Sequence, residues 1–282
     1  MSTGYAPLRD ALARRDENDP VLVGDDSTWR AGALIDAVDD LAARLTGCSS
    51  LAILADNSPS WVIADLATLA AGITHVPLPT FFSGDQLAHV LESAGIDTVL
   101  TDQPERIGAL DLGYAITGRW HGLIRLQRPA SGTASMPAGT AKISFTSGST
   151  GNPKGACLTA DGLLDTAQAV ATRLGDIPVR RHLVTLPLSL LLENTAGIYA
   201  PLLRGAEIHL PGLATLGWQG MAGFDPKLLQ QGVERLRPET MILVPELLKA
   251  WSLLLSATGR KAADSLHFVA VGGARVDARS IA

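Results

Sequence analysis

Short apolar runs alternate with helical patterns along most of this chain of 282 residues, and this alternation is what most limits the folds open to it. Three short apolar runs occupy residues 51–54, 75–78 and 98–100. Helical patterns separate them: one opens at Ser58-Pro59 and runs to Ala71, and the other covers residues 85–94. This βαβαβ order predicts parallel strands with helices packed against them, and so an α/β fold.

The same alternation returns after residue 160 and predicts a second series of elements. We expect helices over residues 161–174, 191–203, 226–235 and 245–255, and strands over residues 183–186, 206–210, 241–244 and 267–271. The N-terminal part predicts a helix over residues 8–14, a small hairpin around the Gly24-Asp25-Asp26 turn, and a helix over residues 31–45.

The composition excludes several classes of protein. A hydrophobic content of 46% is enough for a sizeable core, and a net charge of −5 without any run of basic residues argues against nucleic acid or an anionic membrane as the main partner. The two cysteines, Cys48 and Cys157, are too few for a disulfide framework or a metal cluster. The N-terminus has no apolar core of signal-peptide length, and prolines and polar residues interrupt the most apolar long stretch, residues 183–203. We therefore expect a cytoplasmic protein with no transmembrane segment.

Residues 143–159, ISFTSGSTGNPKGACLT, concentrate glycines, hydroxyls and one lysine at a density that a structural loop does not need. The glycines would let backbone N–H groups approach an anion, the hydroxyls would add donors, and Lys154 would supply the countercharge. The residues concerned are Thr146, Ser147, Gly148, Ser149, Thr150, Gly151, Lys154 and Gly155. No G-K-[ST] or G-x-G-x-x-G motif occurs in the chain, and apolar runs flank the loop on both sides. The pattern therefore predicts a phosphate-binding loop between two strands.

The string TSGSTGNPKG resembles the signature of AMP-forming adenylating enzymes, the superfamily of acyl-CoA synthetases, peptide-synthetase adenylation domains and firefly luciferase. A flexible Ser/Gly turn is the alternative, but it does not explain Pro-Lys-Gly at this spacing. Three further segments resemble the superfamily in its own order: residues 52–80, residues 186–203 and residues 266–276. The second is similar to the segment that lines the acyl pocket, most of all in long-chain acyl-CoA synthetases, and the third to the strand and Gly-Gly-Ala turn on which adenine rests.

This resemblance implies two packed α/β subdomains with mainly parallel sheets, as in the N-terminal domain of adenylate-forming enzymes, incomplete at the C-terminus. Residues 50–178 would form the first subdomain, with the phosphate loop, and residues 1–49 and 179–282 the second, discontinuous one. The two sheets would pack face to face with helices outside. We expect the chain to be the N-terminal portion of a longer enzyme, because the superfamily's later segments, among them a small C-terminal domain with a catalytic lysine, are absent from the sequence. An incomplete sheet would expose apolar surface and favour self-association.

By the same resemblance, the protein would activate a carboxylic acid, foremost a long-chain fatty acid, with ATP and Mg²⁺, and would then transfer the acyl group from acyl-AMP to CoA. Thr146 and Lys154 would act as catalytic residues by stabilising the departing pyrophosphate, and the rest of the loop would bind the phosphates. The residues expected at adenine and the acyl carboxylate are Gly272, Gly273 and Ala274. Those expected at the acyl group are Leu190, Leu191, Glu193, Asn194 and Gly272. No metal site built from the protein's own ligands is expected, because the six histidines and two cysteines show no ligand spacing.

Two departures from the superfamily's pattern leave the acyl substrate open. Leu190 stands where relatives usually have a histidine, and Ala160 where a histidine often follows the phosphate loop. A changed substrate preference and a degenerate enzyme both account for them. The alternatives to an acid–thiol ligase are therefore a catalytically incomplete nucleotide- or acyl-binding protein, a structural half that works with a second polypeptide, and a fatty acyl-AMP ligase that serves an acyl carrier protein.

Overall fold

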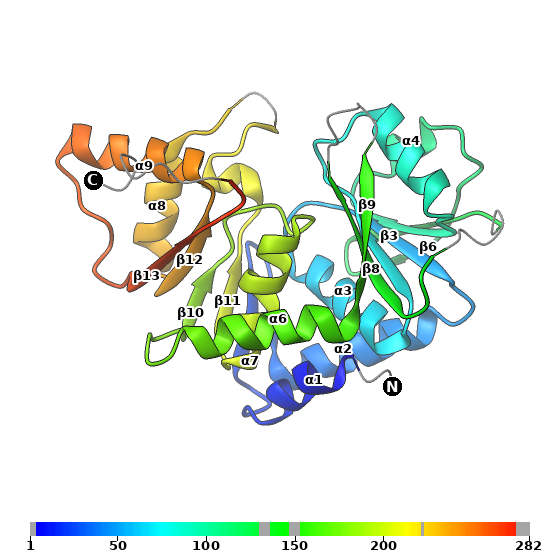
Figure 1. Cartoon of the computed structure of the whole chain (residues 1–282), viewed down its shortest axis with the longest axis horizontal. Coiled ribbons are helices and arrows are strands. Elements are labelled where there is room, and N and C mark those ends of the chain that lie inside the picture. Colours follow the sequence, from blue (N-terminus) through cyan, green and yellow to red (C-terminus); the bar gives the residue numbers. More distant parts are fainter. Residues whose placement is uncertain (1–3, 130–135, 147–152, 221–222, 275–282) are drawn as a thin grey trace.

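Two β-sheets dominate the computed structural model, which describes residues 4–129, 136–146, 153–220 and 223–274 (Figure 1). Within these residues, sheet A has six strands in the order β13-β12-β10-β11-β1-β2, and sheet B has seven in the order β6-β7-β5-β3-β4-β8-β9. The α/β class predicted from the alternation of apolar runs and helical patterns is confirmed.

The strands of sheet A are β1 (Pro20–Gly24), β2 (Thr28–Arg30), β10 (Arg181–Leu183), β11 (Glu207–Leu210), β12 (Thr240–Leu243) and β13 (Phe268–Val271). Those of sheet B are β3 (Ser50–Leu54), β4 (Thr74–Pro77), β5 (Thr98–Thr101), β6 (Ala115–Trp120), β7 (Leu123–Gln127), β8 (Thr140–Thr146) and β9 (Lys154–Thr159). Apart from η1 and α7, which are described below, the helices are α1 (Ala6–Ala13), α2 (Ala31–Arg44), α3 (Pro59–Ala71), α4 (Gly84–Ser93), α5 (Pro104–Gly108), α6 (Ala160–Arg173), α8 (Pro226–Leu236), α9 (Pro245–Thr258) and the 3₁₀ helix η2 (Leu213–Leu216).

Sheet B contains the predicted βαβαβ unit. Strands β5, β3, β4 and β8 run parallel, and α3 and α4 connect β3 to β4 and β4 to β5. Helix α3 begins where the sequence predicts, because the side chain of Ser58 accepts a hydrogen bond from the Trp61 backbone N–H (3.3 Å) and Pro59 takes the first helical position. The antiparallel hairpin β6–β7 at one edge was not predicted: β6 is mostly exposed and so carries no apolar run.

Sheet A takes in the N-terminal strands. β1 runs parallel to β11, with Leu22 opposite Ile208, and β2 completes the predicted hairpin. β10 ends at Leu183, so the strand predicted over residues 183–186 was wrong in its position. Beyond β10 the amide of Asn57 donates to the Leu186 carbonyl (2.8 Å) and accepts from the Leu188 N–H (2.9 Å). These backbone groups are therefore satisfied by a side chain and not by a neighbouring strand.

The expectation that the sheets pack face to face with helices outside was wrong, because α3 lies between them. This helix contacts β1 of sheet A as well as β3 and β4 of sheet B, and it is buried along nearly its whole length. One hydrophobic core joins Leu22 and Ile208 of sheet A to Ile53 of sheet B through the apolar residues of α3. A helix that is apolar on every side is stable only when it is covered on every side, and Asp65 is the one charged residue in α3.

The segment predicted as one helix over residues 191–203 has a wider turn in its middle. Residues Glu193–Tyr199 form the π-helix η1, and α7 (Ala200–Leu203) follows directly. A π-helix bonds residues five apart along the backbone, is rare, and occurs often at functional sites. None of the helices in the described ranges combines the length and the apolar character that a membrane span requires.

Candidate functional site

The predicted phosphate loop joins two strands, as expected, and these strands are antiparallel neighbours. Thr146 ends β8, Lys154 begins β9, and the two residues face each other in the ladder. Lys154 is exposed, so its ammonium group is available to an anion. Five predicted phosphate-binding residues lie outside the described part of the chain: Ser147, Gly148, Ser149, Thr150 and Gly151.

Gly155 has a packing role that its place in the phosphate loop did not suggest. It lies in β9 opposite Phe145. A Cβ atom at this position would lie 2.7 Å from Cγ2 of Ile143 and 2.9 Å from Cζ of Phe145, both closer than carbon atoms normally approach. The absent side chain therefore lets the side chains of β8 pack against β9.

The predicted adenine turn follows β13 at the end of sheet A. The Gly272 N–H donates to the Leu243 carbonyl (3.1 Å), and Gly273 has a φ of 84°, which favours glycine. A Cβ at Gly272 would lie 3.1 Å from Cδ2 of Leu192, so the side chain of Leu192 lies against the glycine turn. Ala274 is the last described residue of this segment.

An apolar cavity of about 600 Å³ adjoins Leu192 and opens between β9, α6 and the start of η1. Its lining residues are Cys157, Leu158, Thr159, Gly162, Leu163, Thr166, Val170, Leu191, Leu192, Thr195 and Ala196. The hydroxyl of Thr195 is buried and has no hydrogen-bond partner in the described part of the chain. The cavity can therefore hold an apolar group and offers it one hydroxyl.

The structure brings one of the four predicted acyl-contacting side chains, that of Leu191, to this cavity. Leu190 instead packs against the core of sheet A, and Asn194 is buried against Asp65 and Lys142. The sequence reasoning missed Leu192, Thr195 and Ala196. Spacing could have identified Thr195 and Ala196, because residues three or four positions after Leu191 or Leu192 share a helix face with them.

Glu193 is turned away from the cavity toward sheet A. Its carboxyl Oε1 accepts from the Thr185 N–H (3.4 Å) and lies 3.9 Å from Nε2 of His182. A Cβ on Gly197 would lie 2.6 Å from that oxygen, so only glycine leaves room for the carboxyl group over the π-helix. Burial raises the pKa of Glu193 well above its usual value and lowers the pKa of His182 to about 3. The neutral forms of both side chains are thus favoured, and the pair is not a salt bridge.

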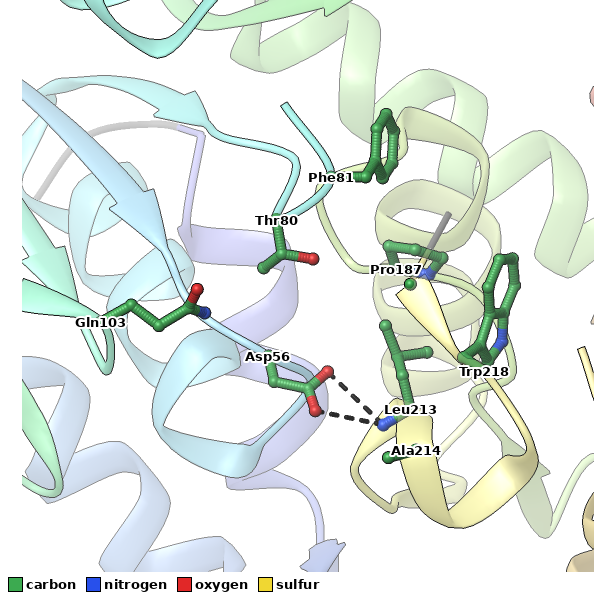
Figure 2. Close-up of a pocket in the computed structure, with 9 residues that line it drawn as sticks. Asp56, Thr80, Phe81, Gln103, Pro187, Leu213, Ala214 and Trp218 are labelled. Carbon is green, nitrogen blue, oxygen red and sulfur yellow. Dashed lines mark hydrogen bonds between the residues drawn. The ribbon is translucent and has the colours of Figure 1, made fainter. Parts of the chain in front are cut away.

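A second cavity, of about 390 Å³, lies where strands of both sheets end (Figure 2). Thr80, Gln103 and Asp56 form one wall, and the other includes Pro187 and Trp218. The Asp56 carboxylate accepts hydrogen bonds from the Leu213 N–H, the shorter being 3.2 Å, and burial raises its pKa. The described lining residues include this carboxylate and neither lysine nor arginine, so the cavity suits a neutral or cationic group better than a phosphate.

The model of the AMP-binding enzyme family matches residues 9–281, and the chain belongs to this family. The resemblance drawn from TSGSTGNPKG and the three further segments is confirmed by this match.

Relatives of two kinds share this sequence pattern. Tyrocidine synthase 3 of Brevibacillus parabrevis is 27% identical over 237 residues, which are 80% of this chain and 3% of the synthase. Long-chain-fatty-acid–CoA ligase 1 of Cavia porcellus is also 27% identical over 237 residues, which are 70% of this chain and 32% of the ligase. The chain thus spans a third or less of the length of these curated relatives.

Solved structures share the fold. O-succinylbenzoate coenzyme A synthetase of Bacillus subtilis, in complex with AMP, superposes with a TM-score of 0.73 at 21% identity, covering 98% of this chain and 55% of the synthetase. The N-terminal domain of FACL13 from Mycobacterium tuberculosis gives a TM-score of 0.75 at 19% identity, covering 100% of this chain and 72% of that domain.

Proposed function

We propose that this chain is the part of an adenylate-forming ligase that binds ATP and a carboxylic acid and joins them as acyl-AMP with release of pyrophosphate. The observation that carries the proposal is that Leu192 contacts the Gly272 turn and also lines the apolar cavity. An acid whose apolar part fills the cavity would hold its carboxylate near this turn. Strand β9 lines the cavity through Cys157 and begins at Lys154, so one strand connects the cavity to the end of the phosphate loop.

The acid needs no general base, because a carboxylic acid is already ionised at neutral pH. What the reaction needs is alignment of the carboxylate with the α-phosphate and stabilisation of the charge that develops on pyrophosphate. Lys154 and Thr146, at the bases of the loop, are the described residues suited to the second task. Mg²⁺ would accompany ATP and share the phosphate charge, and Ser147 to Gly151 would add backbone and hydroxyl donors.

We further propose that the acid carries an apolar acyl chain, with a long-chain fatty acid as the leading candidate, and that CoA is the final acceptor. The cavity lining supports the first point, since it is mainly aliphatic. The match to a fatty-acid–CoA ligase supports both, while the match to tyrocidine synthase keeps a carrier protein open as the acceptor. The cavity of Figure 2 does not suit the phosphates of CoA, because its described lining includes a carboxylate and offers no cation.

ATP–pyrophosphate exchange with linear acids of increasing length tests the proposal. We expect exchange with at least one class of apolar acid, and a rate that rises by about fourfold per methylene until the cavity is filled, from about 0.8 kcal/mol per buried CH₂. Lys154→Met should lower the exchange rate at least tenfold, whereas Lys227→Met, at an exposed lysine of α8, should leave it unchanged. ATP binding without exchange for any acid would instead identify a nucleotide-binding protein.

A further inference from the structure

Five polar side chains meet in the buried space between the two sheets, outside both cavities. Asp65 comes from α3, His75 from β4, Lys142 from β8, and Asn194 and Tyr199 from η1. Lys142 is 1% exposed and Asp65 is fully buried. We call these five residues the central cluster.

The two charges of the central cluster are fully coordinated. The Asp65 carboxylate lies 2.7 Å from Nζ of Lys142 and 2.6 Å from Nδ1 of His75, and it accepts from the amide of Asn194 (2.9 Å) and the hydroxyl of Tyr199 (2.6 Å). Nζ of Lys142 also donates to the Asn194 side-chain carbonyl and to the Tyr199 oxygen (2.9 Å). Burial alone would raise the pKa of Asp65, but Lys142 and His75 outweigh it and hold this pKa well below its usual value. The ionised form of Asp65 is therefore favoured. Burial lowers the pKa of Lys142, but the carboxylate 2.7 Å from its Nζ opposes this shift and favours the charged ammonium group.

The π-helix makes this arrangement possible. Asn194 and Tyr199 are five residues apart, the spacing of π-helical backbone hydrogen bonds, so they lie near one face of η1. In an α-helix of 3.6 residues per turn, residues five apart would point about 140° away from each other. The wider turn thus lets both side chains reach the same carboxylate.

The cluster joins the two parts of the proposed active site. Lys142 lies four residues before Thr146 on the strand that leads to the phosphate loop, and among the described residues β8 joins β4 through the single register pair His75↔Lys142. On its other side β8 pairs with β9, an edge strand. Asn194 lies two residues after Leu192, which lies against the glycine turn and lines the apolar cavity. Because this cavity is proposed to hold the acyl group, we call it the acyl cavity.

We propose that the central cluster is a positioning device that fixes the phosphate-loop strand β8 relative to the π-helix that borders the acyl cavity. The proposal rests on the proposed function for its catalytic meaning, but the local fixing of β8 and η1 is a property of the fold itself. A general stabilising contact would act on the whole chain, whereas a positioning device acts on these two segments and on the ligands they hold.

The test replaces both charges at once with Lys142→Met/Asp65→Asn, which keeps the side-chain shapes and leaves no unpaired buried charge. Amide hydrogen exchange followed by mass spectrometry would be compared with the wild-type chain. We expect at least tenfold faster exchange in residues 140–146 and 193–199, with little change in β3 and β11. Tyr199→Phe, which retains both charges and removes two hydrogen bonds, should give the same pattern more weakly.

The matched control is Trp251→Phe, which removes a buried hydrogen bond to Gln230 (2.7 Å) between α8 and α9. It should speed exchange in those two helices and leave β8 and η1 as they are. The dissociation constant for MgATP, from calorimetry, should rise at least tenfold in Lys142→Met/Asp65→Asn and stay unchanged in the control. Exchange that rises evenly along the chain, or that does not change in β8 and η1, overturns the positioning role. A wild-type chain that binds no MgATP counts against the proposed function alone, since the exchange pattern still decides this inference.

Discussion

Gly155→Ala separates a packing role for this glycine from a phosphate-binding role. The new methyl carbon would lie 2.7 Å from Cγ2 of Ile143 and 2.9 Å from Cζ of Phe145, whereas carbon atoms attract best at about 3.5–4.0 Å. Ile143 is 4% exposed and cannot move into solvent, so β8 and β9 must separate slightly or Phe145 must change its rotamer. Overpacking of this kind costs about 1–3 kcal/mol of unfolding free energy. With about 2–4 °C per kcal/mol for a protein near this size, the melting temperature should fall by about 2–12 °C.

Urea and thermal denaturation would measure this change, with Gly108→Ala as the control. Gly108 ends α5, has open space around it and does not have a positive φ, so alanine there should be neutral or stabilise the protein by up to about 1 kcal/mol. Adding Phe145→Leu to Gly155→Ala should recover part of the loss, because it removes the ring atoms that the methyl group meets. A Gly155→Ala protein with wild-type stability but weaker MgATP binding would refute the packing argument and favour direct approach of the backbone to phosphate.

Three further predictions follow from the buried groups and the acyl cavity. Lys142→Met alone should lower the unfolding free energy by about 3–5 kcal/mol, because it leaves Asp65 charged and unpaired. Lys142→Met/Asp65→Asn should lower it by less. Equal losses for the two variants in urea denaturation would contradict the ion pair. Folding raises the pKa of Glu193, so this residue stabilises the protein fully below its unfolded pKa, near 4.3, and loses that contribution as the pH rises toward its folded pKa. Glu193→Gln should therefore raise the melting temperature more at pH 8 than at pH 5. Ala196→Phe should fill part of the acyl cavity and raise KM for the longest acid used at least tenfold while KM for ATP stays constant; an unchanged chain-length profile in the exchange assay would place the acid elsewhere.

The sequence determined much about this protein because its signals are local. The alternation of apolar runs and helical patterns gave the α/β class, and Ser58-Pro59 gave the start of α3, since a cap and a proline act on their own helix. The string TSGSTGNPKG gave the family, now confirmed, and the apolar runs on either side of it predicted that its loop joins two strands, which are β8 and β9.

The tertiary structure decided what depends on residues far apart in the chain. Its contacts put α3 between the sheets, turned Glu193 toward the Thr185 N–H and took Asn194 into the central cluster. These two polar side chains have hydrogen-bond partners that only the folded chain supplies. The same holds for η1: no local pattern distinguishes a π-helix from an α-helix in residues 193–199, and the wider turn satisfies a carboxylate 129 and 134 residues away in sequence. Local propensity can predict that a segment is helical, but the buried charge at Asp65 decides which side chains of that helix must share a face.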